Sequence, residues 1–149
     1  MHTWFECKIK YEKTAGEGNI IKVNESYLVD ALSFTEAEAK IIEEMKPFIS
    51  GEFTVANIKR ARINEMFFVE NADKWYRSKV NFVTLDEEKG IEKRTAVNMM
   101  IQASDFSQAL HNLKEGMKGT LADYEIASIT ETLIMDVFKY EETGKSKNN

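Results

Sequence analysis

Two short stretches of the sequence place a tryptophan close to cationic side chains. The two sets are Trp4, Lys8 and Lys10, and Trp75, Arg77 and Lys79. Successive side chains of a β-strand point to opposite faces, so the even spacing within each set predicts that its members share one face of a strand. An exposed indole can stack on a base, and a neighbouring lysine or arginine can hold a phosphate. Both sets are therefore candidate binding residues for a nucleotide or a single-stranded nucleic acid.

The same residues also fit a structural role. Large amphipathic rings and lysines are common on surface strands. The two tryptophans would then cover the open end of a core, with lysine stems lying over them. The sequence leaves both interpretations open.

A third basic cluster is KRAR, at residues 59–62. Alternation within a strand predicts that Arg60 and Arg62 lie on one side, which adds both to the candidate binding residues. The second half of the chain has Glu131 and Leu133 at the corresponding positions, so this pair would belong to the first half alone. A solvated strand face, or charges that protect an edge strand, would explain the pair as well.

Residues for catalysis or metal binding form no recognisable set. His2 and His111 are accompanied by no nucleophile motif, and the single cysteine, Cys7, stands between two residues expected in the core. A buried thiol of this kind is unreactive, and one cysteine without a His/Cys cluster gives no zinc site. We therefore expect no catalytic residue, no metal, no cofactor and no enzymatic activity.

Composition restricts the class of protein. The chain has 149 residues, 43% hydrophobic and 30% charged, which is typical of a globular domain with its own core. No run approaches the roughly 20 apolar residues of a membrane-spanning helix, and no secretory signal is visible, so we expect a cytoplasmic protein without a membrane partner. A net charge of −5 repels long polyanions, which favours single strands or a compact nucleotide over duplex DNA.

The sequence resembles itself at an offset of 71 or 72 positions. Trp75 and Tyr76 follow Trp4 and Phe5 by 71 positions. Further matched pairs are Lys8 and Lys79, Ile9 and Val80, Ile58 and Ile129, and Phe67 and Phe138. Such self-similarity predicts an internal repeat, with copies at about 3–69 and 74–140.

Each copy has the pattern strand, strand, helix, strand. The helices open with capping-box spacings, Ser33 to Glu36 and Asp105 to Gln108, and the last strands are expected at 53–68 and 123–140. We therefore predict an α+β fold that is a tandem duplication of a ββαβ unit. It would have six mostly antiparallel strands, two helices packed on one side, and a pseudo-twofold axis.

The two copies would form a single domain, residues 1–149. Their joint is the short polar segment 70–74, and a half of this size would bury too little surface to be stable alone. The polar segment 141–149 is expected to be a flexible tail.

Four longer motifs connect the chain to a known family. They are HTWFECKIKYEKT at 2–14, SYLVDALSFTEAEA at 26–39, FISGEFTV at 48–55 and GMKGTLADYEIASITET at 116–132. The chain resembles, over about residues 2–140, a domain-of-unknown-function family of small proteins from gut bacteria and their phages. The resemblance implies a small cytoplasmic protein of phage origin, and it transfers no reaction, cofactor or site residue.

Two functions are compatible with these features. The first is non-catalytic binding of single-stranded nucleic acid or of a small nucleotide, such as a cyclic dinucleotide whose twofold character would match two related halves. In a phage, such a protein would sequester a nucleotide signal. The second is a protein-interaction or inhibitory module that acts on a host or phage protein, because Trp, Tyr and Arg are residues that anchor interfaces. A homodimer fits either function.

Overall fold

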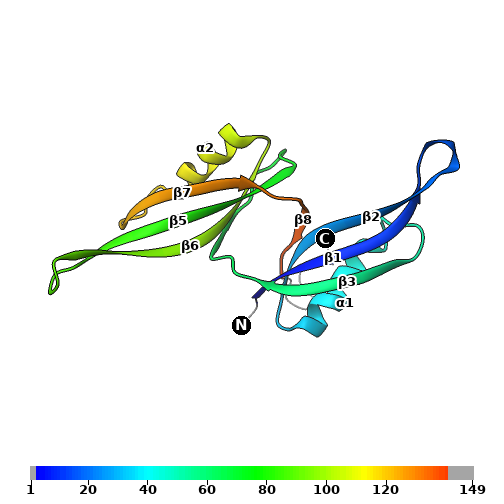
Figure 1. The fold of residues 1–149 in the computed structure, drawn as a ribbon, viewed down its shortest axis with the longest axis horizontal. Helices are drawn as coiled ribbons and strands as arrows, with labels where there is room; N and C mark the ends of the chain where they lie inside the picture. Colours follow the sequence, from blue (N-terminus) through cyan, green and yellow to red (C-terminus); the bar gives the residue numbers. More distant parts are fainter. Residues whose placement is uncertain (1–2, 141–149) are drawn as a thin grey trace, which may run out of the picture. The chain divides into compact units, whose positions relative to one another are not determined.

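The computed structural model describes residues 3–140, which fold into two compact units (Figure 1). Unit 1 comprises Met1–Ala61 and Ile134–Asn149, and unit 2 comprises Arg62–Leu133. The boundaries of the units thus differ from those of the predicted copies, 3–69 and 74–140. That the chain is a single domain stays a prediction, and the expected tail at 141–149 and His2 lie outside the described residues.

Unit 1 is a four-stranded sheet with one helix on one face. Its elements are β1 (Thr3–Thr14), β2 (Ile20–Ala31), α1 (Phe34–Met45), β3 (Phe53–Ala61) and β8 (Ile134–Phe138), with a short 3-10 turn at Gly16–Gly18. The strand order is β3-β1-β2-β8. β1 pairs antiparallel with β2 and β3, and β8 pairs parallel with β2. The core between sheet and helix is formed by Phe5, Cys7, Ile9, Tyr27, Val29, Ala31, Ala37, Ile41 and Met45.

Unit 2 is also a four-stranded sheet with one helix on one face, and it has its own core. Its elements are β4 (Glu65–Phe67), β5 (Lys74–Asp86), β6 (Ile91–Ala103), α2 (Phe106–Gly116) and β7 (Asp123–Glu131). The strand order is β4-β6-β5-β7, with β5 antiparallel to β6 and β7 and β4 parallel to β6. Val80, Met99, Ile101, Leu113 and Met117 form its main core cluster.

The predicted α+β class is confirmed, but the expected number of strands is wrong. The described residues form eight strands in two sheets, where six were expected. Each predicted third strand, 53–68 and 123–140, is two strands, and the second of them pairs in the other unit's sheet. Each helix also covers the sheet of its own unit, so the two helices do not share one side of a common sheet.

The breaks in these strands have identifiable causes. Asn64 donates its backbone N–H to the carbonyl of Asn98 at 2.8 Å, and its side chain accepts from the Asn98 N–H at 2.9 Å. Thr132 donates both its N–H and its hydroxyl to the Trp75 carbonyl, at 2.9 and 2.8 Å. Asn98 and Trp75 both belong to unit 2. These hydrogen bonds hold the chain to unit 2 just after β3 and β7 end, although the apolar pattern of the sequence continues past both strand ends.

Both helices begin as the capping boxes predict. Ser33 Oγ accepts from the Glu36 N–H at 3.1 Å, and Asp105 Oδ1 accepts from the Gln108 N–H at 2.8 Å. In return, Glu36 Oε1 accepts from the N–H of Leu32 and Gln108 Oε1 accepts from the N–H of Ser104, each one residue before the cap. These bonds satisfy backbone donors that a helix start otherwise leaves unpaired.

Candidate functional site

The face of the unit 1 sheet turned away from α1 carries several lysines, among them Lys8, Lys10 and Lys22. The side chains of Cys7 and Ile9 belong to the core under the helix. Lys8 and Lys10 alternate with them along β1 and therefore point to the opposite face, as predicted. Lys10 lies between Asn24 on β2 and Thr54 on β3. Lys22 lies opposite Glu12, and directly opposed residues share a face.

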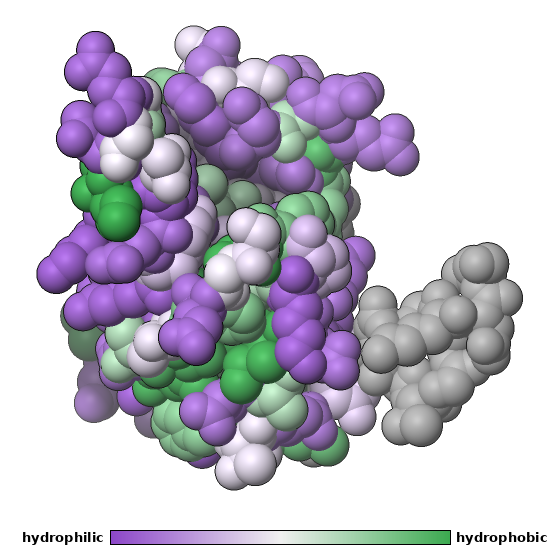
Figure 2. All heavy atoms as spheres, turned by 90° about the vertical axis from the view of Figure 1, so that its right-hand side faces the viewer, coloured by the Kyte–Doolittle hydropathy of each residue, from purple (hydrophilic) through white to green (hydrophobic). Residues whose placement is uncertain are grey.

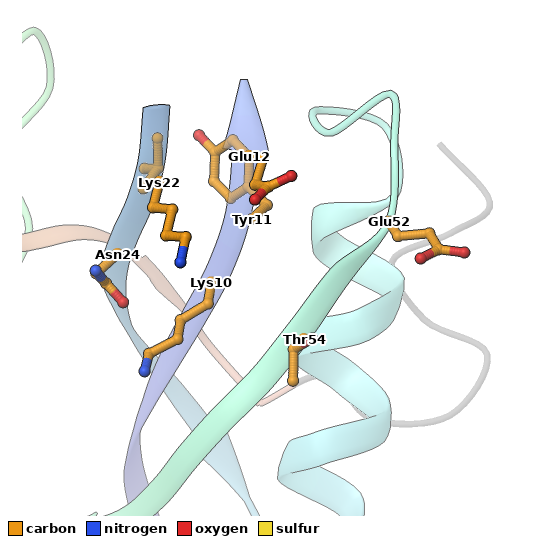
Figure 3. Close-up of a pocket in the computed structure, with 8 residues that line it drawn as sticks. Lys10, Tyr11, Glu12, Lys22, Asn24, Glu52 and Thr54 are labelled. Carbon is orange, nitrogen blue, oxygen red and sulfur yellow. The ribbon is translucent and has the colours of Figure 1, made fainter. Parts of the chain in front are cut away.

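Lys10, Lys22, Asn24 and Thr54 line a pocket at the hairpin end of the sheet. The pocket has a volume of about 620 Å³ and is lined by Lys10, Tyr11, Glu12, Lys22, Val23, Asn24, Glu52 and Thr54; we call it the lysine pocket. In Figure 3 the amino groups of Lys10 and Lys22 and the amide of Asn24 lie on one side, over β1 and β2. The carboxylate of Glu52 points away from them, beyond β3.

The lysine ammonium groups are available to a ligand. Lys8, Lys10 and Lys22 are exposed, and within residues 3–140 none of the three takes part in an ion pair. Glu25 pairs with Ile9 in register and so lies on the α1 side of the sheet, where its carboxylate accepts a hydrogen bond from the Tyr27 hydroxyl at 3.0 Å. Burial and contact with Glu25 raise the pKa values of Tyr11 and Tyr27, so both phenols stay neutral hydrogen-bonding groups at physiological pH. The pocket thus combines two cations, Lys10 and Lys22, with the carboxylates of Glu12 and Glu52 and with neutral polar groups.

Unit 2 differs at the equivalent place. Asn81, 71 positions after Lys10, lies opposite Glu125 on β7, where Lys10 has Thr54. Glu125 in turn accepts two hydrogen bonds from the Arg94 guanidinium, at 2.8 and 3.2 Å. This contact lowers the pKa of Glu125 and raises that of Arg94, so the charges of unit 2 here are already paired. The two faces are chemically unequal.

The two predicted tryptophans have different environments. The Trp4 side chain is half-buried, whereas Trp75 is only 2% exposed and its ring meets Phe68 edge to face at 5.4 Å between centroids. Alternation had placed Trp75 on an exposed face with Arg77 and Lys79, and that expectation is wrong. Both faces are covered near the start of β5, where Trp75 and Tyr76 are both buried. Trp75 therefore offers no surface for stacking.

The predicted arginine pair is not brought together on one strand face. Arg60 pairs with Phe5 in register, and its guanidinium lies 5.7 Å from the Phe5 ring centroid and 5.3 Å from that of Phe34. It therefore covers the edge of the core on the α1 side, away from Lys8 and Lys10. β3 ends at Ala61, so Arg62 lies beyond the strand, and alternation no longer applies to it.

Of the other residues considered, Cys7 behaves as expected. It is fully buried, and burial raises the pKa of its thiol to about 12. His111 is exposed on α2. Arg77 and Lys79 are exposed on β5.

Sequence reasoning missed Lys22, Asn24 and Thr54. A signal for two of them existed: pairing outward from the turn at residues 14–19 puts Lys22 opposite Glu12 and Asn24 opposite Lys10. Thr54 could not be found this way, because the pairing of β1 with β3 contains a bulge between Lys8 and Ile9.

Comparison with known proteins places the chain in a family without assigning an activity. No curated protein matches it. In the described part of the chain, no helix has the length and apolar character needed to cross a membrane. A family model described as "Domain of unknown function (DUF4494)" matches residues 3–140, which confirms the resemblance to such a family. The chain belongs to the DUF4494 family.

Proposed function

We propose that the protein is a non-catalytic binding protein for a nucleotide ligand, and that the lysine pocket is its binding site. The observation that carries this proposal is the position of Lys10 and Lys22 on one sheet face, exposed and outside any ion pair of the described residues. Lysine ammonium groups bind phosphate as point charges. Asn24 and Thr54 add an amide and a hydroxyl that can bind a base edge or a sugar.

Charge favours a small nucleotide over a long strand. The chain as a whole carries −5, and Glu12 and Glu52 also line the pocket. Lys10 and Lys22 balance these two carboxylates, and in Figure 3 the Glu52 carboxylate points away from both ammonium groups. Charges act over about one Debye length, roughly 8 Å in the cell, so a compact anion can contact the two ammonium groups, whereas a long polyanion would meet the acidic surface beyond. A mononucleotide or a cyclic dinucleotide fits this condition better than single-stranded DNA or RNA.

A second candidate function is supported by exposed apolar side chains. Phe48, Leu121 and Leu133 are 78%, 100% and 88% exposed. Figure 2 shows hydrophobic side chains that reach the surface among the hydrophilic side chains of the face it displays. Exposed apolar side chains can anchor a protein partner where they gather into a patch. A protein-interaction or inhibitory module is therefore the alternative.

We further propose that the chain arose by internal duplication of a ββαβ unit. Support comes from the strand orders, which match when β1, β2, β3 and β8 are compared with β5, β6, β7 and β4. The inequality of the two faces would then reflect divergence, with ligand binding kept in unit 1. A cytoplasmic location and the sequestering of a nucleotide signal for a phage belong to the same proposal.

The proposal is tested by isothermal titration calorimetry with ATP, cyclic di-GMP, cyclic di-AMP and a dT oligomer. We expect saturable binding of at least one nucleotide, reduced tenfold or more in Lys10→Ala/Lys22→Ala, because each charged hydrogen bond contributes about 1.5–3 kcal/mol. Lys93→Ala, which removes an exposed lysine from β6 of unit 2, is the matched control. Heat of binding that is equal in all three proteins would reject the pocket, and absence of binding to every ligand would favour the protein-interaction alternative.

A further inference from the structure

Each unit is completed by a strand from the other half of the sequence. β4 follows β3 along the chain but pairs with β6, and β8 follows β7 but pairs with β2. We propose that residues 1–72 and 73–149 are complementary halves that hold each other together without the peptide bond between them. The edge of β2 thus binds β8 from the second half of the sequence, and the edge of β6 binds β4 from the first half.

In unit 1 the incoming strand fills the sheet edge and part of the core. Ile134 and Val137 of β8 are buried, and the ring of Phe138 stacks on Tyr27 with centroids 6.0 Å apart. The ammonium of Lys40 on α1 donates to the carbonyl of Lys139. Strand pairing, apolar burial and a hydrogen bond from the helix therefore all hold β8 in place.

In unit 2 the incoming segment is held along a longer stretch. Phe67 of β4 packs against the core cluster of Val80, Met99, Ile101, Leu113 and Met117. The reciprocal bonds of Asn64 with Asn98 fix its start. The Gln102 side chain fixes its end, because it accepts from the Val69 N–H at 2.9 Å and donates to the Ala72 carbonyl at 2.8 Å.

Each of these contacts joins a residue that precedes the peptide bond between Ala72 and Asp73 to a residue that follows it. Within the connecting segment 70–73, Glu70, Asn71 and Asp73 are exposed, and Asn71 has a positive φ of 64°. Without the opposite half, each sheet would keep three strands, and the β2 edge at Tyr27 and Val29 or the β6 edge at Met99 and Ile101 would lose its partner. Such an unpaired apolar edge is unstable in water and prone to association.

The test begins with the full chain. A protease site is inserted between Ala72 and Asp73, the folded protein is cut, and the product is analysed by size-exclusion chromatography with light scattering. We expect both fragments to elute together at the position of the uncut chain. We also expect them to return to that position after unfolding in urea and refolding.

Variants within one strand separate specific pairing from chance association. Val137→Asp should lose at least half of the shared peak after cutting, because Val137 is 9% exposed. Met135→Asp should keep the peak, because Met135 on the same strand is 52% exposed. If Val137→Asp unfolds the uncut chain, as circular dichroism would show, Phe67→Ala tests the same pairing from the other sheet.

Three outcomes would overturn the proposal. They are separation of the cut protein into two folded fragments, precipitation of the cut protein, and equal loss of the shared peak in Val137→Asp and Met135→Asp. None of these outcomes depends on ligand binding, so they are independent of the proposed function.

Discussion

The ring of Phe67 in β4 lies directly against Gly116, the last residue of α2. A β-carbon on Gly116 would be 2.6 Å from the nearest ring carbon of Phe67. A distance this short cannot persist, so any larger residue must displace the ring from the core of unit 2. The glycine is therefore required for β4 to pack beneath the end of the helix.

Gly116→Ala should destabilise the protein in spite of alanine's better helix propensity. The gain in propensity is about 1 kcal/mol at most and smaller at a helix end, whereas overpacking costs about 1–3 kcal/mol. We expect a net loss of about 1 kcal/mol in urea unfolding. In a Phe67→Ala background the same substitution should be neutral or stabilising, and a loss of equal size in both backgrounds would contradict the contact.

Arg60 should contribute to stability and not to ligand binding. Its guanidinium lies over the rings of Phe5 and Phe34, and a partly exposed cation–π contact contributes about 0.5–1 kcal/mol. Arg60→Ala should lower the unfolding free energy by about this amount and leave nucleotide affinity unchanged in calorimetry. Arg62→Ala is the control for loss of charge alone, and a tenfold loss of affinity in Arg60→Ala would restore this residue to the site.

Cys7 should make the stability depend on pH in alkaline solution. The folded thiol has a pKa of about 12 because it is buried, against 9.0 when exposed. The unfolded chain therefore releases its proton first, and stability that is complete below pH 9 falls as pH rises towards 12. Comparing wild type with Cys7→Ala in urea unfolding from pH 8 to 10.5 isolates this contribution, because the raised pKa of Tyr27 acts in both proteins. If the unfolding free energies of wild type and Cys7→Ala changed equally with pH, burial would not raise the pKa of the Cys7 thiol.

The two tryptophans should report different environments. Trp75 is buried against Phe68 and Trp4 is half-buried, so Trp4→Phe should leave a blue-shifted emission that acrylamide quenches weakly. Trp75→Phe should leave a red-shifted emission that is quenched at least twofold more strongly. Equal quenching of the two variants would contradict the burial of Trp75.

Local features of the fold were predictable from sequence, and the exchange of strands was not. The capping residues Ser33 and Asp105 act over three positions, so their spacing identifies both helix starts. The crossing after β3 depends on hydrogen bonds between Asn64 and Asn98, which are far apart in sequence. The apolar pattern continues through residues 62–64 and 132–133, so nothing local distinguishes one long strand from two strands in different sheets.

The candidate site was predictable only in part. Alternation correctly placed Lys8 and Lys10 opposite the core. It failed for Trp75 because it assumes one solvated face along a whole strand, and it failed for Arg62 because the strand ends before it. The pocket itself depends on which strands are neighbours, so Thr54 became part of the site only once β3 was known to lie beside β1.

The most direct test of the central claim is a backbone amide NMR titration with the nucleotide that binds in calorimetry. The lysine pocket predicts saturable shift changes at Lys10, Lys22, Asn24 and Thr54, with smaller changes elsewhere in β1, β2 and β3. The chemical shifts of backbone amides near Arg94 and Glu125 should not change. Changes centred in unit 2, or changes that persist in Lys10→Ala/Lys22→Ala, would contradict the claim that this pocket is the binding site.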